Sequence, residues 1–447
     1  MSLKSTERQL FMYVTLFSDI LNPDHDLLQA SRLIDWDGLE KALSPFYSPL
    51  GRSGKPIRLM VGIHILKHRY NTSDEQAVEM LHENAYWQCF CGFTTFQKGL
   101  LLEASSLVKF RNRIGQKGLE AIEAAILKAW QGLGLVKTKR LSLDTTAQPK
   151  NIAYPTDADL LHDVREKVVK EVKRARREVA LRKPFRTFCR VGKKILLKIK
   201  KVQRNDPAAR NASLQELRRM TQRVVRQAGR VANTLYARGY QELGRKLNRV
   251  VSLGKTVVSQ TQQVLAGEKP KSRIYSLHES QVAAIKKGKS HVTCEFGAVV
   301  SLAINEDGLV LSHREYQHNV ADVKTIGPLM ARFKQQTGRS PKEVSADRGF
   351  DQSKRKQQSC CRRWQIQRLA IPKKGRRPHP DSYQGWFKKA LKRRVKIEPV
   401  ISHLKSDHRM NRCRYKGVGG DTTNVVWASL AWNTKKITSL YRKKKKR

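Results

Sequence analysis

Acidic residues are scarce in this chain of 447 residues. It carries 38 Asp and Glu against 89 Lys and Arg, so its formal net charge is +51. So much positive self-repulsion calls for a counter-charge, and a polyanion is the usual partner of such a protein. A basic, solvated surface without a specific partner explains the composition poorly.

Long apolar runs are also absent. The apolar stretch FMYVTLF near the start is too short to span a bilayer and lacks the flanks of a signal peptide. We therefore expect no membrane span and a cytoplasmic protein. The closing YRKKKKR, residues 441–447, is a candidate lipid contact, but a disordered basic tail explains it better.

The seven cysteines lack the spacing of a metal framework. Cys89 and Cys91 are one residue apart, and Cys360 and Cys361 are adjacent, whereas zinc knuckles use longer spacings. We expect reduced thiols and no structural zinc. The apolar content of 39% is ordinary, which indicates a folded protein and not a basic disordered one.

The first part of the chain, residues 1–135, is predicted to be a helical, DNA-binding domain. Ile57, Met60 and Ile63 recur with a helical period, and the NTS that follows this stretch interrupts it. Ser73 and Gln76 have the spacing of a capping box, which predicts the start of the next helix. Two helices joined by a short polar turn fit a DNA-binding helix-turn-helix and an ordinary helical hairpin equally well.

From residue 136 onward the pattern changes to alternating strands and helices. LSLD predicts a short strand with Leu141 and Leu143 on one face and Asp144 at its exit. HVTCEFGAVVSLAI, the turn NEDG and LVLSHREY predict a hairpin. A helix then follows, which Asn319 is expected to cap, with Asp322 at its third position. After it, EVSAD and IQRLAIP predict strands, and SKRKQQSCCRRWQ and DSYQGWFKKALKRRVKIE predict helices. This order predicts an α/β fold with a ribonuclease-H-like core, residues 136–447.

A long basic segment, about 157–289, interrupts this core after its first strand. Between residues 161 and 250 it holds 27 Lys and Arg against 7 Asp and Glu, a net charge of +20. Apolar residues follow three- and four-residue steps typical of a helical seam, with one polar exception, Thr221: Leu214, Leu217, Val224, Ala228, Val231 and Leu235. Pro184 and Pro207 are expected to divide the segment into separate helices. We predict a helical arm inserted into the core.

Three acidic residues carry most of the chemical information. Asp144 lies in LSLDTTAQ, Asp347 in EVSADRGF and Glu398 in RRVKIEPVISHLK. Two of them end short apolar strands, and the third lies in a helical pattern. Such a carboxylate trio can hold two divalent metal ions, an arrangement that suits phosphodiester chemistry.

The surroundings of Glu398 are informative in themselves. Arg394 precedes it by four residues and Lys405 follows by seven, spacings that place all three on one face of a helix. That face could bind metal and phosphate, or it could be a solvated face of alternating charge. Pro399 disfavours helix at the residue before it, so Glu398 is expected at a kink or a helix start.

The stretch around Glu398 resembles the Tyr-x2-Arg-x3-Glu-x6-Lys signature of DDE-type insertion-sequence transposases. Arg394, Glu398 and Lys405 match in type and spacing, while Leu391 stands where the family has Tyr. LDTTAQ and SADRGF resemble the family's first and second Asp segments. GRSGKPIRLMVGIHILKHRYNTSDEQAVEML resembles the helical module that precedes such catalytic domains. The resemblance covers most of the chain outside the basic segment.

The resemblance implies an enzyme of bacterial DNA transposition. Asp144, Asp347 and Glu398 would bind two Mg²⁺ or Mn²⁺ ions, one activating water or a DNA 3′-hydroxyl and the other stabilising the leaving oxygen. Lys405 would contact a DNA phosphate, and Arg394 would do the same or orient Glu398. The partners would be double-stranded DNA, both terminal inverted repeats and target, and the protein would act as a homodimer or larger assembly in the bacterial nucleoid.

Other residues are candidates beside this trio. Asp322 is a second candidate for the middle carboxylate, although its position favours a helix cap. Asp157 fits either a supporting role at the site or a turn. The basic loop IPKKGRRP is expected to contact phosphate through a set of four residues, Lys373, Lys374, Arg376 and Arg377. His403 and His408 are expected near DNA and not as metal ligands.

Two rival functions remain open at the level of sequence. A transposase-derived DNA-binding protein would keep the basic surfaces without the chemistry, although all three carboxylates are present here. A metal-dependent nuclease of the same fold would cleave DNA without joining it to a target.

Overall fold

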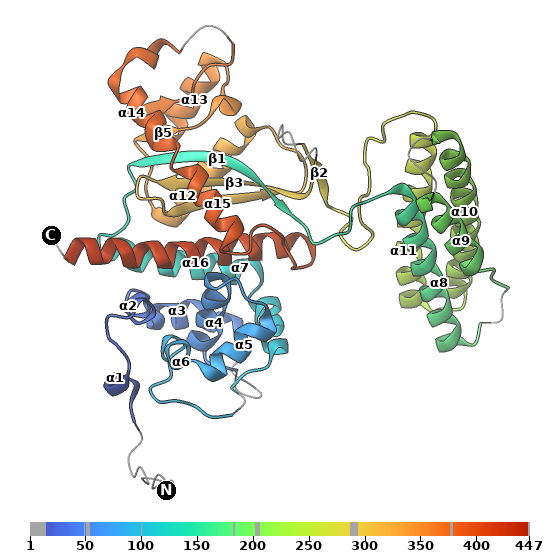
Figure 1. Cartoon of the computed structure of the whole chain (residues 1–447), viewed down its shortest axis with the longest axis horizontal. Coiled ribbons are helices and arrows are strands. Elements are labelled where there is room, and N and C mark those ends of the chain that lie inside the picture. The colour runs from blue at the N-terminus through green and yellow to red at the C-terminus, as the bar shows by residue number, and fades with distance from the viewer. Residues whose placement is uncertain are drawn as a thin grey trace, which may run out of the picture. The chain divides into compact units, whose positions relative to one another are not determined.

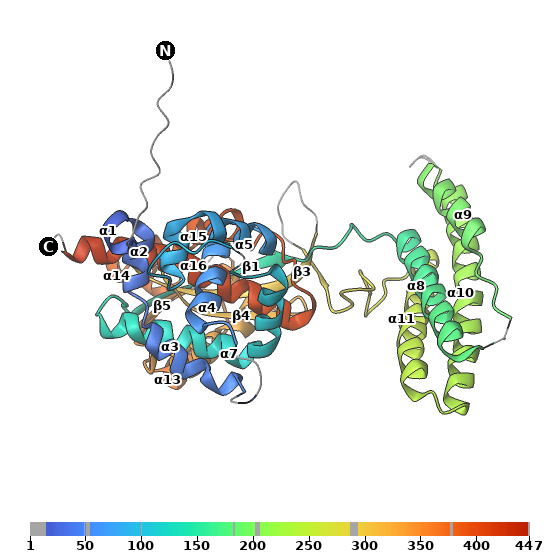
Figure 2. The same ribbon diagram turned by 90° about the horizontal axis from the view of Figure 1, so that it is seen from below.

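The computed structural model describes residues 15–48, 50, 54–99, 101–181, 184–201, 206–286, 294–375 and 379–445. The chain divides into two compact units (Figures 1 and 2). The core unit runs to Lys150 and resumes at Gly297, and the arm unit comprises Asn151–Phe296. Each unit has an apolar core of its own.

The core unit begins with helices. Their bounds are α1 Phe17–Ile20, α2 Asp26–Arg32, α3 Trp36–Leu43, α4 Ile57–Arg69, α5 Asp74–Glu83, α6 Ala85–Phe90 and α7 Ala104–Gly132, with a short 3-10 turn at Ser44–Phe46. The predicted capping box is confirmed, because the Ser73 hydroxyl accepts from the Gln76 N–H and the Gln76 side chain accepts from the Ser73 N–H. Gly115 has a left-handed φ of 52° and kinks α7.

The α4–α5 pair has the character of an ordinary helical hairpin. Nearly every residue of α4 is buried, so α4 has little surface to offer a ligand. On α5, Glu75, Glu79 and Glu83 are exposed at four-residue steps, which gives the helix an acidic outer face. An acidic face repels phosphate, and this favours the hairpin over a recognition helix in the DNA groove.

A mixed sheet forms the second part of the core unit, with strands in the order β3-β1-β5-β6 and β4 beside β3. The short strand β2, which begins the sheet order, belongs to the arm unit. The strands are β1 Arg140–Pro149, β2 Ala283–Ile285, β3 Glu295–Asn305, β4 Val310–Tyr316, β5 Glu343–Ser345 and β6 Arg368–Ala370. β1 and β4 each pair antiparallel with β3, whereas β1, β5 and β6 are parallel. The predicted order of strands and helices, and with it the α/β class, is confirmed.

Helices cover both faces of this sheet. Leu141 and Leu143 of β1 belong to a large apolar cluster with residues of α7, α12 and the N-terminal helices. On the other face, Leu302 of β3 packs with residues of α15 and α16. The remaining helices are α12 Ile326–Thr337, α13 Lys354–Trp364, α14 Gly385–Arg394, α15 Ile397–Ser406 and α16 Gly417–Lys445, with 3-10 turns at Asp322–Thr325, Arg348–Phe350 and Pro380–Tyr383.

The long helix α16 joins the two parts of the core unit. Figure 1 shows it running between the sheet and the N-terminal helices. Trp427 of α16 lies in the cluster shared with those helices, while Val425 and Ala428 pack against β3 and α15. The expected boundary at residue 135 therefore separates two parts that share one apolar core.

The arm unit is a helical bundle of α8 Asp157–Val179, α9 Cys189–Lys201, α10 Pro207–Ala237 and α11 Gln241–Leu265. Pro207 is the first residue of α10, where its missing N–H costs no helical hydrogen bond, and Pro184 lies between α8 and α9. The predicted seam of α10 is confirmed, because all its apolar members and Thr221 are buried. Asp157 begins α8 and accepts a hydrogen bond from Arg273, 2.7 Å away.

Two further expectations concern the basic C-terminal residues and the absence of a membrane-spanning helix. The residues expected to form a disordered basic tail are helical as far as Lys445, and the Arg442 side chain donates to the carbonyl of Asp24. Residues 446–447 lie outside the described part. Over the described ranges, no helix is both long and apolar enough to cross a membrane.

Candidate active site

Asp144 and Asp347 lie at the same edge of the sheet. β1 pairs with β5 only from Arg140 to Ser142, so Asp144 comes two residues after this parallel pairing ends. Asp347 comes two residues after the end of β5. Because β1 and β5 are parallel neighbours, both carboxylates emerge at their carboxyl ends.

The prediction that Asp144 ends its strand was wrong. β1 continues to Pro149, paired antiparallel with β3 from Leu141 to Pro149, and Asp144 lies opposite Leu302. The sequence signal failed because Thr145 and Thr146 suit a strand as well as a turn. The alternation of β1 places Asp144 on the face of Leu302, against which α15, the helix of Glu398, packs.

Glu398 begins a new helix and does not share one with Arg394. α14 ends at Arg394, and α15 starts at Ile397 with Glu398 as its second residue. The helix start expected near Pro399 is therefore confirmed. The prediction that Arg394, Glu398 and Lys405 share one face of a single helix was wrong, because Arg394 lies on α14 and the other two lie on α15. The Glu398 side chain is 60% exposed.

Arg394 connects the carboxylates. Its Nη2 lies 3.5 Å from Asp144 Oδ2, and its Nη1 lies 3.4 Å from Glu398 Oε1. One guanidinium, itself only 17% exposed, thus stands between the first and third members of the predicted trio. It supplies positive charge at a place where carboxylates converge.

Asp322 belongs to this cluster, and its interpretation as a helix cap was wrong. It opens a 3-10 turn, and neither that turn nor α12 is capped by a side chain. Its Oδ1 instead accepts a hydrogen bond of 2.7 Å from the Thr145 hydroxyl. Gly349 lies between two carboxylates, because a β-carbon there would stand 2.3 Å from Asp322 Oδ2 and 2.9 Å from Asp347 Oδ1.

The environment of Asp144 disfavours its charged form. Burial is the main cause, and the negative charges of Asp347 and Asp322 add to it, raising the pKa of Asp144 to about 6. The N–H of Thr145 and the guanidinium of Arg394 act in the opposite direction. A cation beside Asp144 would therefore lower its pKa.

The donors gathered here are carboxylate oxygens, which suit Mg²⁺ or Mn²⁺ better than zinc. Three of them come from the strand-end edge: Asp144, Asp347 and Asp322. In the described part of the chain, no three His, Cys, Asp or Glu side chains are arranged to hold a metal ion. The carboxylate oxygens fit a hard divalent cation. Glu398, the third carboxylate of the predicted trio, is paired with Arg394.

The predicted phosphate-binding residues lie partly beside this edge. The Lys374 Nζ donates to the Gly349 carbonyl over 3.2 Å, and the Lys374 N–H donates to Asp351, so the loop joins the segment that carries Asp347. Lys373 is exposed. Arg376 and Arg377 lie outside the described residues. Lys405 lies on α15, seven residues after Glu398, and is partly buried.

The two histidines expected near DNA, His403 and His408, both make contacts within the protein. His403 is exposed, stacks on Trp432 and has its Nδ1 2.7 Å from Asp407. His408 is buried, and its Nδ1 lies 3.0 Å from the carbonyl of His68, so its side chain packs inside the protein, and its expected place near DNA stays a prediction. The polar sequence around His408 gave no sign that the segment folds against α4.

Comparison with known proteins gives two family matches. Residues 16–113 match the model of a transposase domain (DUF772), and residues 259–434 match the model of a transposase DDE domain. The second match includes Asp347 and Glu398. An uncharacterized protein, ORF8 in the nfe locus of Rhizobium meliloti, is 40% identical over 158 residues, which cover 35% of this chain and 76% of that protein. No solved structure matches the chain.

Proposed function

We propose that this chain, which belongs to the DDE-type insertion-sequence transposases, cleaves DNA at the ends of its element and joins those ends to target DNA. Asp144, Asp347 and Glu398 would carry the chemistry. The convergence of Asp144 and Asp347 at one sheet edge, with Arg394 linking Asp144 to Glu398, is the observation that supports this proposal most directly.

The sheet supports a ribonuclease-H-like core. Three strands, β4, β3 and β1, are antiparallel neighbours, and β5 and β6 continue from β1 in parallel. Catalytic carboxylates of such a core lie where the parallel strands end, and Asp144 and Asp347 occupy that edge. The arm unit joins the chain between β1 and β3, which fits a basic insertion into this core.

The carboxylates would be the ligands of divalent cations. Bound Mg²⁺ or Mn²⁺ would supply activation of the attacking oxygen and stabilisation of the leaving oxygen. Asp144 and Asp347 would hold the ions, and Asp322 would add negative charge and fix Thr145 beside Asp144. Arg394 would keep Glu398 close to Asp144 and be free to move to a DNA phosphate when a cation takes its place.

The basic residues around the edge would hold the DNA. Lys405 and the loop of Lys373 and Lys374 lie on segments that carry or touch catalytic residues. Phosphate contacts from these residues would set the position of the scissile bond without reading sequence. Joining two element ends in one event would require at least two copies of the chain on DNA.

A strand-joining assay tests this function against its two rivals. The substrate is an end duplex already cut to leave a 3′-hydroxyl, incubated with the full chain, Mg²⁺ and a plasmid target. A transposase yields plasmid joined to the end, and the product disappears with EDTA. Nicked plasmid without joined product would indicate a nuclease, and binding without either product would indicate a silent DNA-binding protein.

A further inference from the structure

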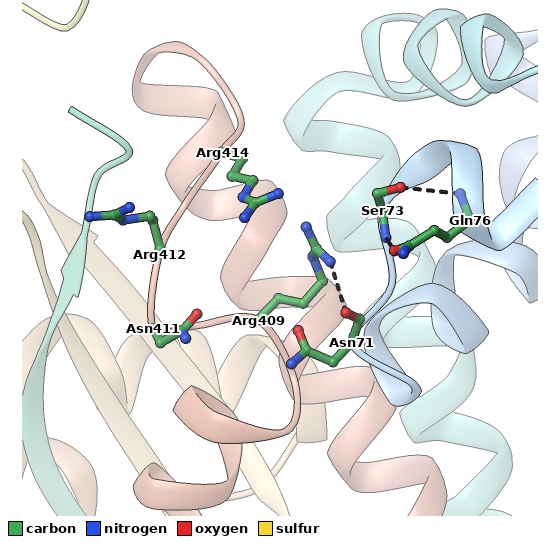
Figure 3. Close-up of a pocket in the computed structure, with 7 residues that line it drawn as sticks. All are labelled: Asn71, Ser73, Gln76, Arg409, Asn411, Arg412 and Arg414. Carbon is green, nitrogen blue, oxygen red and sulfur yellow. Dashed lines mark hydrogen bonds between the residues drawn. The ribbon is translucent and has the colours of Figure 1, made fainter. Parts of the chain in front are cut away.

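A polar pocket of about 580 Å³ lies on the core unit, and none of the candidate catalytic carboxylates lines it. Two segments line it, the turn between α4 and α5 and the stretch that follows α15 (Figure 3). The lining residues are polar or positively charged and include no carboxylate: Asn71, Ser73, Gln76, Arg409, Asn411, Arg412 and Arg414. Three arginines therefore line one hollow, and Figure 3 shows the side chains of Arg409 and Arg414 on the same side of their segment, toward Ser73 and Gln76.

Two of these arginines have no partner in the described structure. Arg412 and Arg414 are exposed, and neither side chain makes a hydrogen bond or ion pair with a described residue. Cys413 between them is buried, and its N–H donates to the Pro149 carbonyl over 2.7 Å in a bridge beside β1. Because side chains alternate along an extended segment, this bridge leaves Arg412 and Arg414 on the solvent side.

The third arginine fixes the floor of the pocket. Arg409 donates from Nη1 to the Asn71 carbonyl over 3.1 Å and also to the Thr72 carbonyl, which ties the two lining segments together. Its backbone has a left-handed φ of 68°, a conformation that a non-glycine residue holds only where its surroundings enforce it. Burial lowers the pKa of Arg409, and the like charge of Arg414 lowers it further.

A buried network holds the arginine segment in place. The hydroxyl of Tyr415, a partly buried residue, accepts from Lys67 Nζ over 2.9 Å. The Tyr415 ring faces Lys67 and Arg111, both of which pair with Asp74. Two acidic residues act electrostatically on Arg409: Asp74, which is already engaged with Lys67 and Arg111, and Glu75, which is exposed on α5. The segment is thus ordered before any ligand arrives, which reduces the entropic cost of binding.

We propose that this pocket binds a phosphate of the DNA backbone that is distinct from the phosphate undergoing reaction. The inference rests on the proposed function only in taking DNA as the partner. Phosphodiester oxygens are acceptors, and unpaired guanidinium groups are donors whose fork geometry matches them. The open, polar hollow fits a chain of phosphates better than an apolar ligand. Binding there would fix the position of DNA on the core unit.

The test compares two double variants of the full chain. Arg412→Gln with Arg414→Gln removes the unpaired pocket charges. Lys128→Gln with Arg339→Gln removes two exposed charges, from α7 and from the segment after α12, that do not line the pocket. Equal melting temperatures of the three proteins establish that folding is unchanged. Duplex binding is measured by fluorescence anisotropy in EDTA, so that no chemistry occurs.

The duplexes carry one neutral methylphosphonate at each backbone position in turn. We expect at least one position where the substitution weakens binding to the wild type and to the control variant but not to the pocket variant. The slope of log affinity against log salt should also fall by about 0.9 for each phosphate that the pocket variant no longer neutralises, and should stay unchanged in the control. Identical methylphosphonate profiles and identical slopes for all three proteins would overturn the inference.

Two further outcomes are separable. Inorganic phosphate that raises the melting temperature of the wild type but not of the pocket variant, with unchanged DNA profiles, would show a small-anion site and overturn the assignment to DNA. A chain that binds DNA in this assay but joins no ends would contradict the proposed function and leave the pocket assignment intact. A wild type that binds no duplex would overturn both.

Discussion

At the scale of single residues, the site is defined by one carboxylate whose surroundings oppose its charge. Asp144 is largely buried and lies near two other carboxylates, which together raise its pKa to about 6. Arg394 offsets part of this effect. Under the proposed function, a bound cation would offset this negative charge and lower the pKa of Asp144.

The first prediction concerns Asp144→Asn in metal-free buffer. A folded-state pKa raised above its unfolded value means that ionisation destabilises the fold, so the cost is absent below about pH 4 and complete above about pH 6. The variant should therefore be more stable than the wild type at pH 7.5, by about 3 kcal/mol at most, and equally stable at pH 4. Thermal unfolding at both pH values in EDTA measures this.

Glu79→Gln is the matched control for that experiment, because Glu79 is exposed on α5 and is not one of the carboxylates that surround Asp144. It should leave stability unchanged at both pH values. Added Mg²⁺ should stabilise the wild type more than Asp144→Asn. A variant less stable than the wild type at pH 7.5 without metal would show that the cluster does not oppose the charge of Asp144.

At the scale of elements, α16 is the feature that makes one unit of the helices and the sheet. It is buried on nearly all sides between Gly420 and Thr438. Trp427 is completely buried, and its ring stacks on that of His64 of α4, with centroids 4.8 Å apart. Since β4 and α15 also pack against α16, a change in the packing of α16 should destabilise both the N-terminal helices and the sheet.

The second prediction is that Trp427→Ala destabilises the whole core unit. Truncating a fully buried tryptophan costs about 3–5 kcal/mol through reduced burial and a residual cavity. Urea unfolding followed by circular dichroism should show a lower midpoint for the core unit. Tyr383→Ala removes an aromatic ring that is 76% exposed and should shift the midpoint little. If Trp427→Ala behaved like Tyr383→Ala, α16 would not be the shared support.

Most of these elements could be predicted from local patterns, and the misses have physical causes. The capping box of Ser73 and the seam of α10 depend on neighbours in sequence, so spacing sufficed. The length of β1 depends on pairing with β3, more than 140 residues later, and no local signal records it. The position of Asp322 depends on the same long-range pairing, because β4 carries it to the edge where Thr145 lies.

The site was likewise predictable only in part. The three candidate carboxylates could be chosen from their local sequence, and their place in catalysis stays a prediction. Their spatial relation could not, since Glu398 reaches Asp144 through Arg394, and no local spacing records that contact, although Pro399 did predict the helix start at Glu398. The pocket of Arg409, Arg412 and Arg414 was invisible in sequence, because its second wall comes from residues 71–76.

At the scale of the whole molecule, positive charge is concentrated in the arm unit. Residues 161–250 have a net charge of +20, and the bundle buries its apolar seam while leaving arginines on its surface. Arg177, Arg219, Arg223 and Arg226 are exposed. We therefore expect the arm unit to hold DNA without reading its sequence.

The third prediction follows from replacing these four arginines by Ala together. Affinity for an end duplex and for a scrambled duplex should fall similarly, and the slope of log affinity against log salt should flatten by about 0.9 for each phosphate that is no longer neutralised. Fluorescence anisotropy over a range of salt concentrations measures both. An unchanged slope would mean that the arm is a solvated bundle that merely separates β1 from β3.

Metal-dependent cleavage and joining of DNA should depend on all three of Asp144, Asp347 and Glu398. Asp144→Asn, Asp347→Asn and Glu398→Gln keep side-chain shape and remove one ligand charge each, so each should bind an end duplex nearly as the wild type does. Each should reduce cleavage and joining by orders of magnitude in Mg²⁺, because two-metal chemistry depends on every ligand. Asp381→Asn, at a carboxylate 38% exposed in the turn before α14, is the control and should retain activity. Cleavage by Glu398→Gln at near wild-type rate, measured beside that control, would contradict this assignment.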